Sequence, residues 1–459
     1  MASLQTLPLE LTVLITSYLP LPSLKNLSLC SHHFRAPTLP SIFTNLHVSF
    51  NNSSSSLDGF AGSLYHIKSY VKHITISVPS PLGLDVELFF QYVEAVGLSL
   101  HTLDKLTSLK ILLSSSRHTL DVLEGFDDHV FSLLLHPGDG EDEAKLSHYK
   151  TLQTLQIEIT SIQEKWTPEV DKFRSELEST RQQMLLRSVD LDSGRFRPPS
   201  QLPALREFSV KTDPRHLQET DSEDISGYRM LSHCDSSNIL SLLAGSVDSL
   251  ESLNVWMRID SYDFGPLIEF PGRLVFPNVK QLRFHSWFLW CDDEDTLEFE
   301  GGTHLVTLSQ AAPNVEDLAL YLEWRLLNSS LTIEGIDRAF SEFKEYGISG
   351  LKTVRMGWPR ILAMTEEGKM GFYQLVGTEE LGDKLLEWSY QGFEKLEKVV
   401  FVRIAEGQND IVDESFEAIS ATLRMGEDGI KVVEWSEAYT EKLLDMELQD
   451  WLDNPIRTF

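Results

Sequence analysis

Apolar residues recur along most of the chain as a hexad whose first, fourth and sixth positions are apolar and whose other positions are mainly polar. Residues two positions apart lie on one face of a β-strand, so each hexad predicts a short strand with one buried face. The copies are Val71-Ile74-Ile76, Leu109-Leu112 with Ser114 in the last place, Leu152-Leu155-Ile157, Leu205-Phe208-Val210, Leu250-Leu253-Val255, Val279-Leu282-Phe284, Val315-Leu318-Leu320, Leu351-Val354-Met356, Leu396-Val399-Phe401 and Ile430-Val433-Trp435. This recurrence indicates one structural unit that is repeated along the chain.

Stretches with helical spacing of apolar residues separate the hexads. They predict helices over residues 85–96, 119–136, 238–245, 333–346, 379–388 and 414–425. A further amphipathic helix, at about 163–187, begins near Pro168 and carries Val170, Phe173 and Leu177 on one side, and we interpret it as an insertion between two units. Each unit is therefore expected to be a strand followed by a helix, which places the chain in the α/β class.

These strand–helix units resemble leucine-rich repeats, and the resemblance implies a solenoid with parallel strands on its concave face and helices on its convex face. A doubly wound α/β sheet would also place parallel apolar strands between helices, and it stays open as the alternative fold. No glycine-rich phosphate loop follows a hexad, and no catalytic motif with recognisable spacing occurs. We therefore predict no catalytic residue, no cofactor and no metal site, and we interpret the run Asp292–Asp295 as a solvated acidic loop.

The first forty-odd residues follow a different pattern. One helix is predicted by five apolar residues at helical spacing and is stopped by Pro20 and Pro22; the five are Leu11, Leu14, Ile15, Tyr18 and Leu19. A second helix is expected to be capped by Ser23 and to place Leu24, Leu27, Cys30 and then Phe34 on a common side. A third short helix is expected at residues 41–45. Three helices of this size enclose their own apolar faces poorly, so a partner or the rest of the chain must cover them.

The order of these residues resembles the F-box motif, with Leu7-Pro8, Glu10, the two apolar helices, and a closing Ser31-His32-His33-Phe34. The resemblance implies docking onto the linker subunit of an SCF-type ubiquitin ligase. The contacts that it implies are Leu7, Pro8, Leu11, Ile15, Leu24, Leu27, Cys30 and Phe34. Alternatively, the same helices cap the repeat array with their apolar faces turned inward. We expect Cys30 to be a small buried apolar side chain and not a zinc ligand, because no ligand pair follows at zinc spacing.

The expected organisation is an F-box over residues 1–48, a linker over 49–66 that contains the polar run NNSSSS, and the solenoid over 67–459. The chain of 459 residues has 69 acidic and 39 basic side chains, and its net charge of −30 argues against nucleic acid and anionic membranes as partners. The sequence predicts neither a signal peptide nor a spanning helix. Its three cysteines form no close pair, so we expect a reducing compartment, cytoplasmic or nuclear.

Strand alternation also predicts a recognition face. The residues between and just after the apolar positions of a hexad are expected to point away from the buried side, to the concave face. In the later copies they include arginines and aromatic residues, whereas Thr75, Ser77, Thr154, Gln156 and Ser209 occupy the earlier copies. The residues predicted to face a target are Trp256, Arg258, Arg283, His285, Trp287, Tyr321 and Arg355, a set suited to an acidic or phosphorylated peptide. Alternatively, the aromatic rings pack against one another or against loops, and the arginines pair with local acids.

Together these patterns predict a substrate-recognition subunit that is not itself an enzyme. Its F-box would bind the linker subunit and through it a cullin, while the repeats would bind an unknown target protein. Two alternatives stay open. One is a repeat scaffold that does not join a ligase, and the other is an α/β enzyme with an unrecognised site.

Overall fold

The computed structural model describes residues 7–49, 64–78, 93, 95–100, 102–116, 151–162, 202–212, 243–257, 275–286, 311–322, 333–345, 347–357, 373–404 and 415–442. The chain divides into two compact units, Met1–Leu205 with Ile456–Phe459, and Arg206–Pro455. Among the described residues, no helix is long and apolar enough to cross a membrane.

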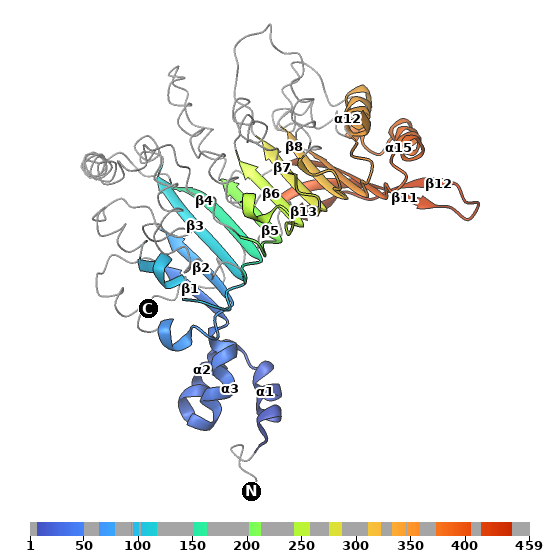
Figure 1. Cartoon of the computed structure of the whole chain (residues 1–459). Coiled ribbons are helices and arrows are strands. Elements are labelled where there is room, and N and C mark those ends of the chain that lie inside the picture. The colour runs from blue at the N-terminus through green and yellow to red at the C-terminus, as the bar shows by residue number, and fades with distance from the viewer. Residues whose placement is uncertain are drawn as a thin grey trace, which may run out of the picture. The chain divides into compact units, whose positions relative to one another are not determined.

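Three helices open the first unit, namely α1 (Leu9–Ser17), α2 (Leu21–Cys30) and α3 (His32–Phe43), and α1 and α2 both pack against α3 (Figure 1). The prediction that Ser23 caps the second helix is wrong, because α2 begins directly after Pro20 and no side chain caps its first turn. The third helix is also longer than expected. Its first turn is capped by Ser31, whose hydroxyl accepts a hydrogen bond from the backbone N–H of His33 at 3.2 Å.

Parallel strands follow the helices in the first unit. They are β1 (Asn45–Ser49), β2 (His73–Val78), β3 (Ser108–Ser116) and β4 (Thr154–Ile162), and they pair in chain order. The register aligns Ile74 with Leu109 and Leu109 with Leu155. The buried hexad positions at β3 are therefore Leu106, which precedes the strand, and Leu109 and Ile111 within it. The sequence assignment that began this hexad at Leu109 is wrong, because apolar spacing fits both frames and pairing with β2 selects one.

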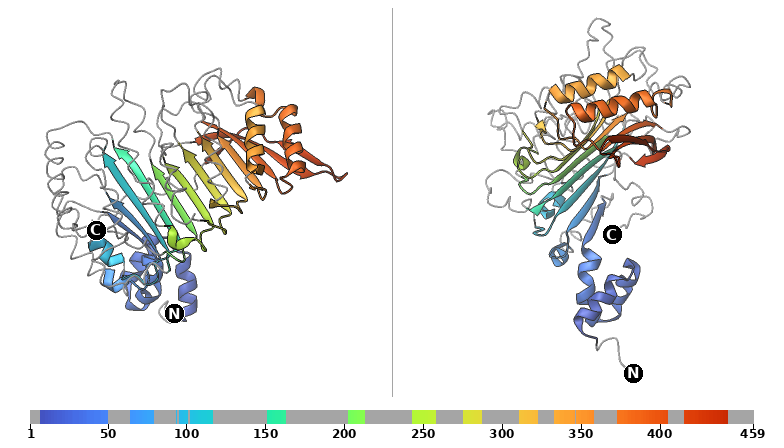
Figure 2. Two further views of the ribbon diagram at one scale, coloured as in Figure 1. Left: turned by 45° about the horizontal axis from the view of Figure 1, so that its top comes forward. Right: turned by 90° about the vertical axis from the view of Figure 1, so that its right-hand side faces the viewer.

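The second unit continues with six parallel strands in chain order, β5 (Glu207–Thr212), β6 (Ser252–Met257), β7 (Gln281–Ser286), β8 (Asp317–Leu322), β9 (Thr353–Gly357) and β10 (Lys398–Ile404) (Figure 2). A short 3₁₀ turn, η7 (Ala244–Ser246), precedes β6. Beyond β10 the pairing becomes antiparallel. β11 (Ser415–Met425) pairs with β10, and both β12 (Lys431–Trp435) and β13 (Tyr439–Lys442) pair with β11.

The hexad pattern is confirmed in the parallel strands. From β2 to β10, the first two apolar positions of each hexad are buried, once β3 is read in its corrected frame. The prediction that the last hexad is a further copy of this unit is wrong, since β12 pairs antiparallel with β11 and Ile430 is 58% exposed. The described part of the chain is thus an α/β arrangement of mostly parallel strands with helices before and between them.

The helix expected at residues 414–425 is wrong, because this segment forms β11. Phe416, Ile419 and Leu423 have helical spacing, but Ile419, Ala421 and Leu423 also alternate and are buried as one face of the strand. The residues from Phe416 to Thr422 each have a partner on β10. Where a short apolar pattern fits both periods, the available strand neighbour decides the structure.

The two helices expected late in the chain are confirmed as α12 (Ile333–Glu345) and α15 (Glu379–Gln391), which lie side by side (Figure 2). Phe340 of α12 stacks on Trp388 of α15 with ring centroids 4.3 Å apart. The indole N–H of Trp388 donates a hydrogen bond to Asp337 at 2.6 Å. The other expected helices, at 85–96, 119–136, 163–187 and 238–245, lie wholly or largely outside the described residues, as do the linker run and Asp292–Asp295.

Candidate protein-binding surface

The helix α1 is inverted relative to an ordinary surface helix. Its buried residues are Thr12 and Thr16, each only 2% exposed, and no large apolar residue of α1 is buried. Both hydroxyl groups are satisfied within the helix, because Thr12 donates to the carbonyl of Pro8 at 3.2 Å and Thr16 donates to that of Val13 at 2.9 Å. Internal satisfaction of the hydroxyls lets two polar residues pack in the interior without an unpaired donor.

The opposite side of α1 carries its large apolar residues. Leu11, Leu14, Ile15 and Tyr18 are 46%, 53%, 45% and 81% exposed, and we call these four residues the α1 apolar surface. Their spacing of three and four residues places them on adjoining parts of one helix face. Leu9 and Val13 of α1 are also exposed but do not belong to this face. A contiguous apolar surface of this kind marks a site of contact with another molecule, whereas single exposed apolar residues carry no such meaning.

The other residues that the F-box resemblance implies fall into two groups. Leu24 of α2 and Phe34 of α3 are 5% and 8% exposed, so they belong to the interior of the three-helix unit and not to its surface. Leu7 and Leu27 are half-buried, and Pro8 and Cys30 are exposed. The expectation that Cys30 is buried is wrong, because it is the last residue of α2 and lies where that helix leaves the interior.

Sequence reasoning omitted several exposed apolar residues from the predicted contacts. Leu14 and Tyr18 already belonged to the apolar face read from the sequence, so the signal for them was present. Leu29 of α2 is 84% exposed and gave no comparable signal, because it is not three or four residues from Leu24 or Leu27 and so lies off their helix face. The inward position of Thr12 and Thr16 was not foreseeable from residue type, since threonine at helix positions usually faces solvent.

The residues predicted to face a target are brought together in part. Trp256, His285 and Tyr321 occupy one cross-strand row on β6, β7 and β8. Arg283 and Arg355 share the next row and are separated by Ala319 of β8. The other two members of the set, Arg258 and Trp287, lie outside the described residues.

One of these arginines has a local acid beside it. The guanidinium of Arg355 pairs with the carboxylate of Asp317, one strand away on the same face. This ion pair supports the alternative interpretation, in which the arginines pair with local acidic residues and do not face a target. It also holds the side chain of Arg355 in one orientation, which a binding surface requires as well.

The corresponding face of the first unit carries two polar pairs. The imidazole Nε2 of His47 lies 2.8 Å from the hydroxyl of Ser77, and burial lowers the pKa of His47 below its ordinary value of 6.5. Lys110 of β3 pairs with Glu158 of β4 at 2.9 Å, with side chains 20% and 7% exposed. No group of three or more His, Cys, Asp or Glu side chains within the described residues is arranged to hold a metal ion.

No protein-family model matches the chain, and no curated protein matches it. The case for a function therefore depends on the surfaces described above and on the resemblance in the first forty-odd residues.

Proposed function

We propose that the protein is a substrate-recognition subunit of an SCF-type ubiquitin ligase. In this proposal α1, α2 and α3 bind the linker subunit, and through it a cullin, while the strands of the second unit hold a target protein. The proposal assigns no catalytic residue and no cofactor to this chain. Ubiquitin transfer is left to other subunits.

The observation that carries the proposal is the inversion of α1. Two threonines face the interior, while Leu11, Leu14, Ile15 and Tyr18 face outward. A helical cap that turned its apolar face onto the rest of the chain would bury these four residues and expose the threonines. A docking helix needs the observed arrangement, because exposed apolar area becomes binding energy when a partner removes it from water.

The strand arrangement supports the repeat part of the proposal. Strands β5 to β10 pair in chain order, and the same two hexad positions are buried in each. A doubly wound sheet reverses its strand order at a switch point, and no such reversal occurs within these six strands. We therefore propose that the array is an irregular leucine-rich-repeat-like solenoid, whose face with Arg283 and Arg355 takes the target.

The proposal is tested by binding of the full-length chain to a purified complex of the linker subunit and a cullin. The variant Leu11→Ala with Ile15→Ala removes two half-exposed side chains, each expected to contribute roughly 1 kcal/mol when covered. The pair should weaken binding by roughly 2 kcal/mol, or about 30-fold in Kd. Because both side chains are already partly in water, the melting temperature should change little.

The matched control is Ile430→Ala with Val432→Ala, which removes two side chains of similar type that are 58% and 42% exposed in the second unit. Its Kd should equal that of the parent. Absence of binding by the parent chain would refute membership of the ligase and favour the scaffold that does not join it. Parent binding that both variants leave unchanged would refute the assignment of α1 as the contact.

A further inference from the structure

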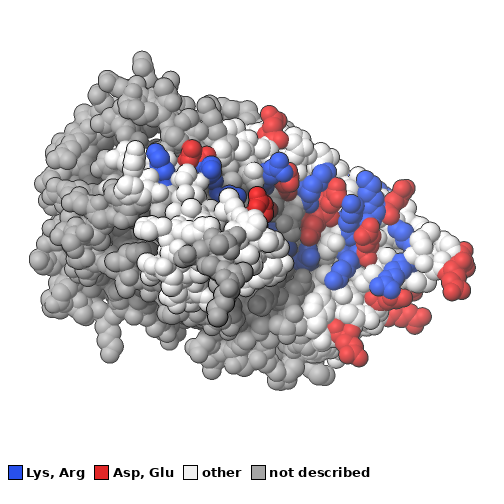
Figure 3. All heavy atoms as spheres, turned by 90° about the horizontal axis from the view of Figure 1, so that it is seen from below, with Lys and Arg blue, Asp and Glu red and all other residues white. Residues whose placement is uncertain are grey.

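The residue directly before each parallel strand of the second unit is charged, and its sign alternates from strand to strand. We call these six residues the edge ladder: Arg206, Glu251, Lys280, Glu316, Lys352 and Glu397. They precede β5 to β10 in turn. Basic and acidic side chains are accordingly interleaved along the described surface in Figure 3.

Backbone hydrogen bonds hold the ladder residues next to one another. Each ladder residue after Arg206 donates its backbone N–H to the backbone carbonyl of the preceding ladder residue, at 2.7 to 2.9 Å. The parallel register that aligns the strands therefore extends one residue past their ends. As a result, neighbouring ladder residues face each other directly, as paired side chains do within a sheet.

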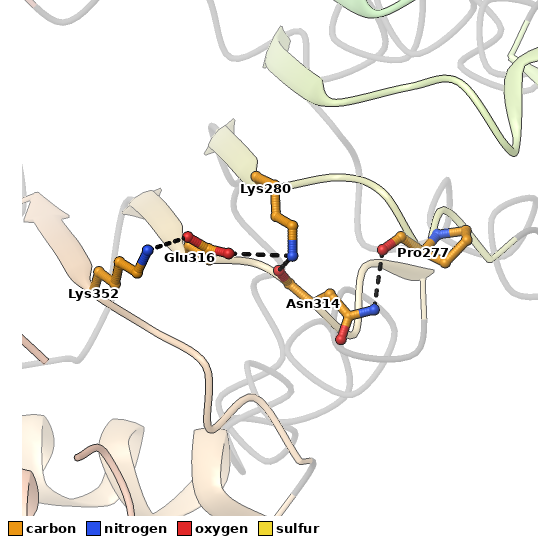
Figure 4. Close-up of polar contacts among 5 residues, drawn as sticks. All are labelled: Pro277, Lys280, Asn314, Glu316 and Lys352. Carbon is orange, nitrogen blue, oxygen red and sulfur yellow. Dashed lines mark hydrogen bonds and ion pairs between the residues drawn. The ribbon is translucent and has the colours of Figure 1, made fainter. Parts of the chain in front are cut away.

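Opposite charges meet along the ladder. Arg206 lies 3.5 Å from Glu251, and Glu316 lies 3.2 Å from Lys280 and 2.6 Å from Lys352 (Figure 4). The hydrogen bonds from Lys352 and then Lys280 lower the pKa of Glu316, and the bond to Glu316 raises the pKa of Lys352. Glu316 is thus held by a basic neighbour on each side.

Side-chain amides form hydrogen bonds between the turns that precede the strands and carry ladder residues. Asn314 donates to the carbonyl of Pro277 at 3.0 Å, and Asn278 donates to that of Asp248 at 2.7 Å. The ammonium of Lys280 also reaches the carbonyl of Asn314 at 3.3 Å (Figure 4). These contacts tie together the turns that precede β6, β7 and β8.

The buried side of the strands does not distinguish one neighbour from another. Every strand from β5 to β10 presents the same apolar hexad, so a strand that skipped its neighbour would still find an apolar partner of the same form. Mispairing of this kind, within one chain or between two copies, is a characteristic failure of repeat proteins. At the ladder, however, a skip of one strand would place Lys280 beside Lys352, or Glu251 beside Glu316.

We propose that the edge ladder selects the correct strand neighbour during folding of the second unit. Alternation of sign makes every true neighbour attractive and every second neighbour repulsive, which the uniform hexads do not do. Surface ion pairs add little to stability, so the effect of the ladder lies in the difference between correct and skipped pairing. This role does not depend on whether the chain joins a ligase.

The test compares refolding of the full-length chain with that of three variants, by dilution from denaturant at low salt followed by size-exclusion chromatography with light scattering. A neutral variant replaces all six ladder residues by Gln and keeps the net charge of −30, because three residues are basic and three acidic. An inverted variant exchanges every basic residue for Glu and every Glu for Lys. The third, Glu316→Lys, places three like charges in sequence along the edge.

We expect the neutral variant to give a roughly two- to five-fold larger fraction of oligomers than the parent, with a similar melting temperature once folded. The inverted variant should refold as the parent does, and Glu316→Lys should give the largest oligomer fraction. Refolding of the parent in 1 M salt should resemble the neutral variant, since screening then acts within roughly 3 Å.

Equal oligomer fractions for the parent and the neutral variant would overturn the proposal. So would an inverted variant that refolds no better than Glu316→Lys, because alternation would then not be the property that matters. If the neutral variant does not fold, the comparison of the inverted variant with Glu316→Lys still decides the question.

Discussion

The ion pair between Lys110 and Glu158 allows the sharpest quantitative prediction for the first unit. The side chain of Glu158 is only 7% exposed, and the ammonium of Lys110 on the neighbouring strand lies 2.9 Å from its carboxylate. Replacement of Lys110 by Met keeps most of the apolar stem but leaves a nearly buried charge without its partner. Loss of one member of a buried pair typically costs about 3–5 kcal/mol.

Because Lys110 is still 20% exposed, we expect a value near the lower end, about 3 kcal/mol. The reverse change, Glu158→Leu, should cost less, since the long Lys110 side chain can move its ammonium towards water. The double variant should lie within about 1 kcal/mol of the parent, because it removes both charges and keeps the volume filled. The prediction is thus a strong coupling in a double-mutant cycle.

The assay is native-state hydrogen exchange by mass spectrometry on peptides that cover β3 and β4, since this reports local opening in a chain of two units. Lys110→Met should speed exchange there by roughly 150-fold, the equivalent of about 3 kcal/mol. Exchange in α15 serves as the internal control and should not change. A change below about 0.5 kcal/mol in β3 and β4 would show that this face is well solvated and would refute the reasoning.

Three further predictions concern single side chains. Trp388→Phe keeps the aromatic stack but loses the hydrogen bond to Asp337, so the free energy of unfolding from urea denaturation should fall by about 1.5 kcal/mol, with Asp337→Asn costing less. The pKa of Glu316 is lowered in the folded chain from its ordinary 4.5. The ionised carboxylate therefore stabilises the folded state above pH 4.5, and this stabilisation is lost as the pH falls through the lower folded pKa. The difference in melting temperature between the parent and Glu316→Gln should vanish in acid. Burial also lowers the pKa of His47 from 6.5, so the folded state disfavours the charged imidazole. The protection factors of β1 and β2, which divide out the pH dependence of intrinsic amide exchange, should therefore fall as the pH drops below 6.5. A His47→Gln variant that kept the same pH dependence of protection would contradict this.

Much of the strand framework was predictable because it depends on local spacing. In a hexad such as Leu152-Leu155-Ile157 the last two apolar residues are two positions apart, so an extended strand places both on one face, and the structure buries them together with Leu152, which precedes the strand. The helices α12 and α15 were equally predictable, because each is long and strongly periodic. Register was less predictable. In β3 two frames fitted the apolar pattern, and only the neighbouring strand distinguished them.

The candidate binding surface shows the same division. The sequence indicated an apolar helix that Pro20 ends, and it indicated that the first three helices could not cover their own apolar residues. It did not indicate that Thr12 and Thr16 would take the inner side, because residue type alone places threonine outside. Contact with α3 decided that orientation, and with it the exposure of Leu11 and Ile15.

By itself, the sequence determined that the hexads form strands and that the first helix ends before Pro20, because both depend on local spacing. It also places charged residues of alternating sign before β5 to β10. The tertiary structure decided what depends on neighbours: that residues 414–425 form β11 and not a helix, and that the charges from Arg206 to Glu397 stand side by side. The physical reason is that apolar spacing fixes how a segment buries its own face, whereas hydrogen bonds between strands fix which segment lies beside it.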